Sequence, residues 1–184
     1  MSMDQALQQH ILNRFWIDDE GYIRRRNASN GKPAGAMVAA STQKNSQHLI
    51  LVFNYNQKQK GLSYGRVAWL LHHGEVPSVG LEIDHVDRDP RNNRKSNLRL
   101  ATRTEQVWNT RGHRTGPKNV YYDKVAKTWN VQLQVKGKVH GRYQIATEQE
   151  AAAIAAEMRA ELHGRFAFDT SLSAPTSLVS SEVN

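Results

Sequence analysis

The stretch LEIDHVDRDPRNNRKSNLRLATRTEQVWN, residues 81–109, decides how the rest of the chain is interpreted. A short apolar run ends at Asp84 and His85, and a loop dense in Asp, Asn and Arg follows. A carboxylate suits a hard cation such as Mg²⁺, and an imidazole can take a proton from water near neutral pH. Asp84 and His85 therefore indicate a site in which a metal ion and a general base act together.

Cationic side chains follow the Asp-His pair closely: Arg88, Arg91, Arg94, Lys95, Arg99 and Arg103. A metal, a base and phosphate-binding cations are what phosphodiester cleavage requires. The net charge of +8 and the pI of about 9.9 also point to an anionic partner. An Asp-His pair alone is usually a surface pair without chemistry, so the prediction depends on the whole ordered stretch.

The segment IDHVDRDPRNNRKSNLRLATRTEQ, with RVAWLLHHG at residues 66–74 before it, resembles the phage and homing-type HNH endonucleases. The resemblance implies a ββα-metal nuclease module in which Asp84 binds the metal, His85 is the general base, and Asn97 fixes the loop and the base. Among the basic side chains, we expect Arg88, Arg94 and Arg103 to position the phosphates of double-stranded DNA. With one carboxylate at the centre, we expect one Mg²⁺ or Mn²⁺ ion per active site.

The second metal ligand of the family is an Asn in the helix that follows, and its position here is held by Gln106. Either Gln106 serves as the ligand, or Asn109 replaces it, or the site is weak. The last possibility gives an alternative function, a DNA-binding regulator on an inactive HNH scaffold. An RNA-binding protein is less favoured, because no aromatic-rich platform for single strands is apparent. Asn92 and Asn93 are interpreted as turn residues.

A second module is predicted from three strands at residues 120–122, 128–135 and 139–145, with a tight turn at 136–137. Alternation along the middle strand places one polar set on the open face of the sheet. Two side chains of the next strand are predicted to join this face, which would then carry Asn130, Gln132, Gln134, His140 and Arg142. A helix with Thr147 as N-cap and Gly164 as its stop covers the other face.

This module resembles the AP2-type DNA-binding domain, in NVYY at residues 119–122, KTW at 127–129, KGK at 136–138 and TEQEAA at 147–152. The resemblance implies a three-stranded antiparallel sheet, backed by a helix, that lays its open face into a DNA groove. Asn130, Gln132, His140 and Arg142 are the DNA-binding residues that we expect from it.

The predicted fold class is therefore α+β, with an HNH nuclease domain at residues 1–110, a basic linker at 111–118, an AP2-like domain at 119–168 and a disordered tail at 169–184. The nuclease domain should begin with a helix within residues 1–14, a hairpin around 19–21 and strands at 36–40 and 48–54. The absence of Cys excludes disulfides and thiolate zinc sites. No membrane segment, signal peptide or small-molecule cofactor is expected, and the cytoplasm of a phage-infected bacterium is the expected location.

Overall fold

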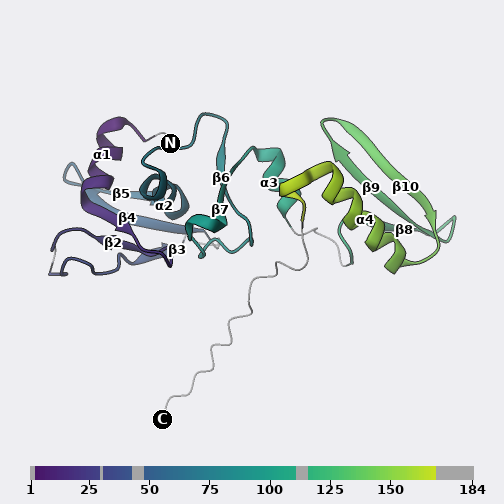
Figure 1. Cartoon of the computed structure of the whole chain (residues 1–184), viewed down its shortest axis with the longest axis horizontal. Coiled ribbons are helices and arrows are strands. Elements are labelled where there is room, and N and C mark those ends of the chain that lie inside the picture. The colour runs from purple at the N-terminus through teal and green to yellow at the C-terminus, as the bar shows by residue number, and fades with distance from the viewer. Residues whose placement is uncertain (1–2, 30, 43–47, 111–115, 169–184) are drawn as a thin grey trace, which may run out of the picture. The chain divides into compact units, whose positions relative to one another are not determined.

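The computed structural model describes residues 3–29, 31–42, 48–110 and 116–168. These residues form two compact units, unit 1 up to Thr102 and unit 2 from Arg103 onward. The division falls before the short helix α3 (Arg103–Asn109), not at residue 110, so this helix belongs to unit 2. Both units combine helices with small antiparallel sheets (Figure 1). The predicted disordered tail and most of the predicted linker lie outside the described residues.

Unit 1 begins with α1 (Gln5–Arg14), whose N-cap Asp4 accepts a hydrogen bond from the amide of Leu7 at 2.8 Å. The strands β1 (Phe15–Ile17) and β2 (Ile23–Arg25) form the predicted hairpin. A second sheet has the order β3-β4-β5, from β3 (Ala40–Thr42), β4 (Leu49–Tyr55) and β5 (Lys58–Ser63). The sequence did not predict β5, and β3 lies later than the expected strand at residues 36–40.

The helix α2 (Tyr64–His73) packs against β4 and β5 and forms the centre of unit 1. It ends at Gly74, whose φ of 77° is left-handed and whose amide donates to the carbonyl of Leu70. The core is made of fully buried apolar side chains from α1, both hairpin strands, β4 and α2: Leu7, Ile11, Phe15, Ile23, Leu51, Val67 and Leu70. The strand pair that carries the Asp-His motif, β6 (Glu82–His85) and β7 (Leu98–Ala101), packs against Ala68 and Trp69 of α2 through Ile83, Leu98 and Leu100.

Unit 2 contains a three-stranded antiparallel sheet of order β10-β9-β8, from β8 (Val120–Asp123), β9 (Thr128–Val135) and β10 (Lys138–Ile145). The helix α4 (Glu148–His163) lies along one face of this sheet (Figure 1). Its N-cap Thr147 accepts a hydrogen bond from the amide of Glu150 at 3.2 Å, as the capping box predicts. The buried layer between helix and sheet consists of Val131, Leu133, Ile145, Ala151, Ala155 and Met158.

The register of β10 corrects the expected open face of this sheet. The turn at Lys136 and Gly137 pairs Val135 with Lys138, so His140 lies opposite Leu133 and Arg142 opposite Val131. Directly opposed residues point to the same face. His140 and Arg142 therefore lie on the face that α4 covers, at the edge strand, and the prediction that they share the open face with Gln132 was wrong.

Asn130 also differs from its expected placement. Its side chain is buried, and its Oδ1 accepts a hydrogen bond from the amide of Gln144 at 3.0 Å. Gln144 lies in the irregular stretch of β10, between Arg142 and Ile145, where the register shifts. Asn130 thus stabilises a β-bulge and is not exposed on the open face. Gln132 and Gln134 are exposed, as predicted.

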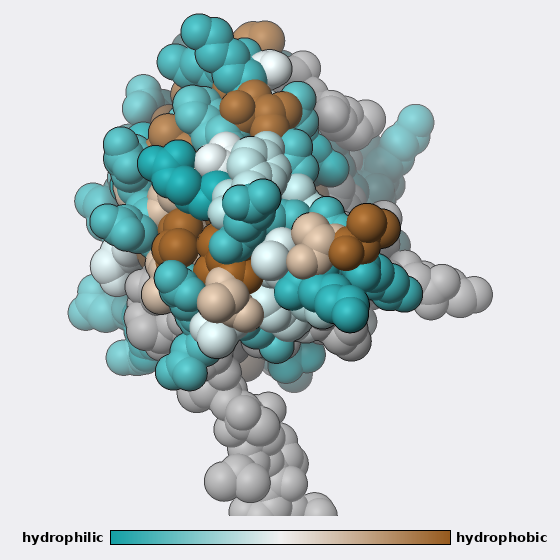
Figure 2. Space-filling model, turned by 90° about the vertical axis from the view of Figure 1, so that its right-hand side faces the viewer, coloured by the Kyte–Doolittle hydropathy of each residue, from teal (hydrophilic) through white to brown (hydrophobic). Residues whose placement is uncertain are grey.

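The surface in Figure 2 is mostly hydrophilic, with separate hydrophobic side chains between the polar ones. The large hydrophobic residues that unit 2 exposes are Val107, Tyr122, Val125, Val139 and Tyr143. None of the helices described is both long enough and apolar enough to cross a membrane.

Candidate active site

The strand β6 carries Asp84 and His85 at its end, and successive residues of a strand point to opposite faces. Asp84 lies opposite Arg99 of β7, and the Arg99 Nε and Nη2 atoms both approach Asp84 Oδ2 at 2.7 Å. Both side chains are largely buried, with 11% of Asp84 and 13% of Arg99 exposed. The carboxylate therefore has a cationic neighbour within the fold.

His85 faces the loop between the two strands, where Asn93 is its partner. The His85 Nε2 and the Asn93 Oδ1 are 3.2 Å apart. The Asn93 Nδ2 donates to the carbonyls of Pro90 and Arg91 at 3.2 and 3.1 Å, which fixes the orientation of the amide. Since Oδ1 can only accept, His85 carries its proton on Nε2, and the lone pair of the neutral ring is on Nδ1.

The pKa of His85 is lowered from its ordinary value of 6.5. Burial is the main cause, because it disfavours the charged ring, and it outweighs the opposing effects of the Asn93 hydrogen bond and of Asp87, Asp84 and Asp89. His85 is therefore neutral at pH 7, which is the form that accepts a proton.

Asn93 is fully buried, and its position depends on two further parts of unit 1. Its carbonyl accepts a hydrogen bond from His72 Nε2 at 3.0 Å. A Cβ on Gly21, in the β1–β2 hairpin, would lie 2.5 Å from the carbonyl carbon of Asn93 and 2.6 Å from the Arg94 nitrogen. The hairpin backbone is therefore packed directly on the loop that holds His85. The sequence interpretation of Asn93 as a turn residue missed this role.

Asn97 organises the same loop from its other end. Its Oδ1 accepts from the Asp87 amide at 3.0 Å, and its Nδ2 donates to Asp87 Oδ1 at 2.9 Å and to the Asn92 carbonyl at 2.7 Å. These bonds fit the loop-fixing role that the family resemblance implied. The side chain that bonds to the imidazole is that of Asn93.

The arginines expected to hold phosphates are distributed over both units. Arg88 has a left-handed φ of 68° and donates its amide to the His85 carbonyl at 2.9 Å, so it closes the turn after the motif. Arg94 forms an ion pair with Glu20 and is half exposed. Arg103 is exposed on α3.

Residues 65–107 match the family model described as HNH endonuclease. Protein 3.8 of Escherichia phage T7 is 32% identical over 117 residues, which cover 62% of this chain and 95% of that protein. Residues 65–107 therefore form a domain of the HNH endonuclease family.

Two further proteins resemble parts of this chain. The uncharacterized HNH endonuclease L560 of Acanthamoeba polyphaga mimivirus is 36% identical over 100 residues, 53% of this chain and 51% of that protein. Among solved structures, one titled "DNA binding and cleavage by the HNH homing endonuclease I-HmuI" is similar to part of this chain. The aligned part is 51% of this chain and 49% of that chain, with 22% sequence identity and a TM-score of 0.41. The chain thus spans about half the length of each of these two proteins.

HNH nucleases generally use a divalent metal. The question here is whether the side chains around Asp84 could bind such an ion. The described residues contain no cluster of three or more His, Cys, Asp or Glu side chains suited to a metal. Mg²⁺ commonly binds through one or two carboxylates and keeps several waters, with substrate phosphates completing its shell. One carboxylate at the end of β6 fits this manner of binding.

The HNH match extends into α3, where the expected amide ligand lies. Gln106 is partly exposed, whereas Asn109 is only 4% exposed.

Proposed function

We propose that this chain is a metal-dependent DNA endonuclease that hydrolyses phosphodiester bonds. The observation that carries the proposal is the hydrogen bond between His85 Nε2 and the Oδ1 of the buried Asn93, on the residue that follows Asp84 in β6. The match of residues 65–107 to the HNH endonuclease family supports the same reaction class.

In this proposal His85 acts as the general base. Its Nε2–H is held by Asn93 Oδ1, so Nδ1 accepts a proton from the attacking water. Asn97 keeps the loop closed through Asp87 and Asn92, and it acts as a positioning residue. Asp84 and Gln106 are the proposed ligands of one Mg²⁺ or Mn²⁺ ion. When bound, such an ion stabilises negative charge on the phosphate and on the leaving 3′ oxygen.

Double-stranded DNA is the proposed substrate, because a net charge of +8 favours a polyanion. Arg88, Arg94 and Arg103 are proposed to hold phosphates. We further propose that the sheet of unit 2 is an AP2-like DNA-binding element, with Gln132 on its open face and His140 and Arg142 at its β10 edge. The relatives in a phage and a virus support action in an infected host cell.

Cleavage of supercoiled plasmid with and without Mg²⁺ tests the proposal. His85→Ala should lower the nicking rate by about 10²–10⁴-fold, the usual effect of removing a general base, while DNA binding in a mobility-shift assay persists. His48→Ala is the matched control, because His48 is an exposed histidine of the same unit. Equal cleavage by His85→Ala and the wild type would refute the mechanism.

A DNA-binding regulator on an inactive scaffold is the second candidate. The ion pair between Arg99 and Asp84 favours it, because a cationic side chain already compensates the carboxylate. The replacement of the family Asn by Gln106 favours it too. In that case the wild type does not cleave plasmid at any Mg²⁺ concentration, whereas Gln106→Asn gains cleavage.

A further inference from the structure

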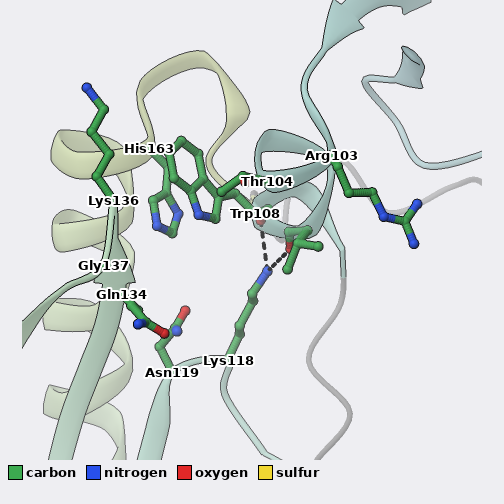
Figure 3. Close-up of a pocket in the computed structure, with 10 residues that line it drawn as sticks. Arg103, Thr104, Trp108, Lys118, Asn119, Gln134, Lys136, Gly137 and His163 are labelled. Atoms are coloured by element: carbon green, nitrogen blue, oxygen red, sulfur yellow. Dashed lines mark hydrogen bonds between the residues drawn. The ribbon is translucent and has the colours of Figure 1, made fainter. Parts of the chain in front are cut away.

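A cavity of about 490 Å³ lies within unit 2, among α3, the start of β8, the β9–β10 turn and the end of α4 (Figure 3). One wall is the ring of Trp108, which stacks on that of His163 with the centroids 4.4 Å apart. Lys118 supports this wall, because its Nζ donates to the Trp108 carbonyl at 2.8 Å. Both ring nitrogens of His163 and the Oδ1 of Asn119 lack a partner in the described part of the chain, but these atoms are themselves buried. The cavity therefore gives no indication of a particular ligand.

A smaller pocket of unit 1 presents charged groups instead. It has a volume of about 160 Å³ and lies where the end of α1 and the β1–β2 hairpin meet β4 and β5. Its polar lining residues are Arg14, Arg25, Asn54 and Gln59. The other lining residues are apolar, yet most of the open surface is polar, so nitrogen and oxygen atoms face the space.

The volume of this pocket limits the size of its ligand. Sites for small molecules and cofactors usually measure about 300–1,000 Å³, so a nucleoside is too large. A water molecule takes about 30 Å³ in the liquid, so the space of about 160 Å³ equals that of roughly five waters. A small hydrated ion is therefore the appropriate size.

The register of the β1–β2 hairpin turns Arg25 toward this pocket. Arg25 lies directly opposite Phe15, and directly opposed residues point to the same face. Phe15 is fully buried and packs edge-on against Phe53 of β4, with the ring centroids 5.7 Å apart. Arg25 therefore points to the core side of the hairpin, where its Nη1 donates to Ser29 Oγ at 2.9 Å. A charged side chain is seldom placed on such a side without a partner for its charge.

Arg14 brings a second positive charge to the same pocket. It is the last residue of α1, and its Cζ lies 6.0 Å from the centroid of the Phe15 ring. The negative end of the helix dipole accounts for a cation at this position, but it does not account for Arg25 on the neighbouring hairpin. Two guanidinium groups around one space repel each other, and an anion between them reverses that effect.

No acidic side chain of the described residues balances these two charges. Neither Arg14 nor Arg25 forms an ion pair there. Arg24 differs, because its Nε lies 2.5 Å from Asp18 Oδ2. Since successive residues of a strand point to opposite faces, that pair lies on the other face of β2. The missing counter-charge is therefore specific to the pocket.

The β4–β5 hairpin supplies uncharged donors on the other side of the pocket. Asn54 of β4 lies opposite Gln59 of β5, so both side chains are on the same face of this hairpin. Both residues are exposed, and neither side-chain amide hydrogen-bonds to another described residue. A carboxamide NH₂ can donate two hydrogen bonds, so these groups can complete the shell of an anion that the arginines hold.

We propose that this pocket, formed by Arg14, Arg25, Asn54 and Gln59, binds a phosphate group. Phosphate oxygens accept hydrogen bonds from several directions, and guanidinium groups bind them bidentately. A carboxylate fits less well, because its two oxygens lie in one plane and one arginine can satisfy both. Inorganic phosphate and the backbone of a DNA strand present the same kind of oxygens. The pocket uses only unit 1 and does not depend on the proposed cleavage by His85.

Calorimetric titration of the full-length protein with sodium phosphate tests the proposal, with sodium chloride of equal ionic strength as the reference. EDTA is present, so cleavage cannot affect the result. The wild type should bind phosphate saturably and in excess of chloride. A second titration uses protein saturated with a duplex oligonucleotide. Loss of phosphate binding in that complex would identify a DNA phosphate as the ligand, whereas unchanged binding would identify free phosphate.

Three variants separate the pocket from general charge attraction. Arg14→Met and Arg25→Met remove the charge but keep an unbranched apolar side chain, and each should weaken phosphate binding about tenfold or more. Each should also lower the slope of log K against log salt concentration for duplex DNA by about 1, if DNA occupies the pocket. Asn54→Ala changes an exposed position and should weaken phosphate binding by several-fold without disturbing the core.

The matched control is Arg24→Met, because it removes the same charge from the same strand on the face that Asp18 already compensates. It should bind phosphate and DNA like the wild type, and thermal melts show whether each variant is folded. Wild-type phosphate affinity and an unchanged salt slope in the folded Arg14→Met, Arg25→Met and Asn54→Ala variants would overturn the proposal. Absence of phosphate binding by the wild type, together with unchanged slopes, would overturn it as well.

Discussion

The role of Asn93 follows from its position in the fold and not from its place in the sequence. In the sequence it is one of two adjacent asparagines in a loop, and that pattern is typical of a turn. In the structure it is fully buried and orients His85, which precedes it by eight positions. Periodicity cannot predict such a contact, because the intervening loop has no regular repeat. Asp84, His85 and Asn97 could be proposed from the sequence because their order in the chain is itself the motif.

Gln106 and Asn109 can be distinguished by mutation. Gln106→Ala should lose Mg²⁺-dependent nicking, because displacement of order 1 Å at a reacting centre already costs about 10²-fold. Asn109→Ala should keep nicking per folded molecule but lower the Tm, because Asn109 is buried. Nicking rates across a Mg²⁺ titration decide between them. If Asn109→Ala is the inactive variant while it remains folded, the assignment of the ligand is wrong.

His163 should make unit 2 sensitive to acid. Its pKa is about 4 in the folded state, because of burial and the cations Lys118 and Arg159, and near 6.5 when the chain is unfolded. Between these values the unfolded state binds more protons, so stability falls as the pH decreases from about 6.5 to about 4. The Tm should therefore fall more between pH 7 and pH 5 in the wild type than in His163→Phe. An equal fall in Tm for the wild type and His163→Phe would contradict a lowered pKa for His163 in the folded state.

Among the elements, those with complete local signals were predicted most closely. The helix α4 runs from its capping box at Thr147 to Gly164, and β9 has the expected bounds of residues 128–135. The strand β5, KQKGLS, has only one buried residue, Leu62, so it carries no clear alternation. Tertiary pairing with β4 forms it instead.

The misplacement of His140 and Arg142 was avoidable from the sequence. A two-residue turn at 136–137 was predicted correctly, and such a turn fixes which residues oppose each other. Counting from Val135 and Lys138 places His140 opposite Leu133. The burial of Asn130 was not predictable in this way, because it depends on a bulge that the regular pattern does not reveal.

The β1–β2 hairpin should be sensitive to substitution at Gly21. Gly21→Ala places a methyl group against the backbone of Asn93 and Arg94, and it also strains a φ of 86°. Gly35→Ala is the matched control, because its φ of 80° gives similar strain but a Cβ there meets no atom within 4 Å. We expect a loss of about 1–2 kcal/mol for Gly35→Ala and about 1–3 kcal/mol more for Gly21→Ala in urea unfolding. Only Gly21→Ala should also reduce plasmid nicking. Equal losses of stability and of nicking in the two variants would contradict the packing of Gly21 on the Asn93–Arg94 backbone.

The charge of the whole molecule predicts how DNA binding responds to salt. With a net charge of +8, affinity for duplex DNA should fall linearly on a plot of log K against log salt concentration. Arg142→Ala should reduce the slope by about 1 if the side chain contacts a phosphate. Arg24→Ala is the control, since the Arg24 guanidinium is bonded to Asp18 at 2.5 Å. An affinity that does not change between low and high salt would refute charge-driven binding.

The helix α3 also limits how this protein can be recombined. The HNH match ends at residue 107, but α3 belongs to unit 2, where Trp108 stacks on His163 and Lys118 binds the last carbonyls of the helix. A crossover after residue 110 would join the helix to a foreign sheet and break those contacts. A crossover before Arg103 preserves them, but it also transfers Gln106. A chimera joined at this boundary would therefore take the residue at position 106 from the protein that donates the second unit.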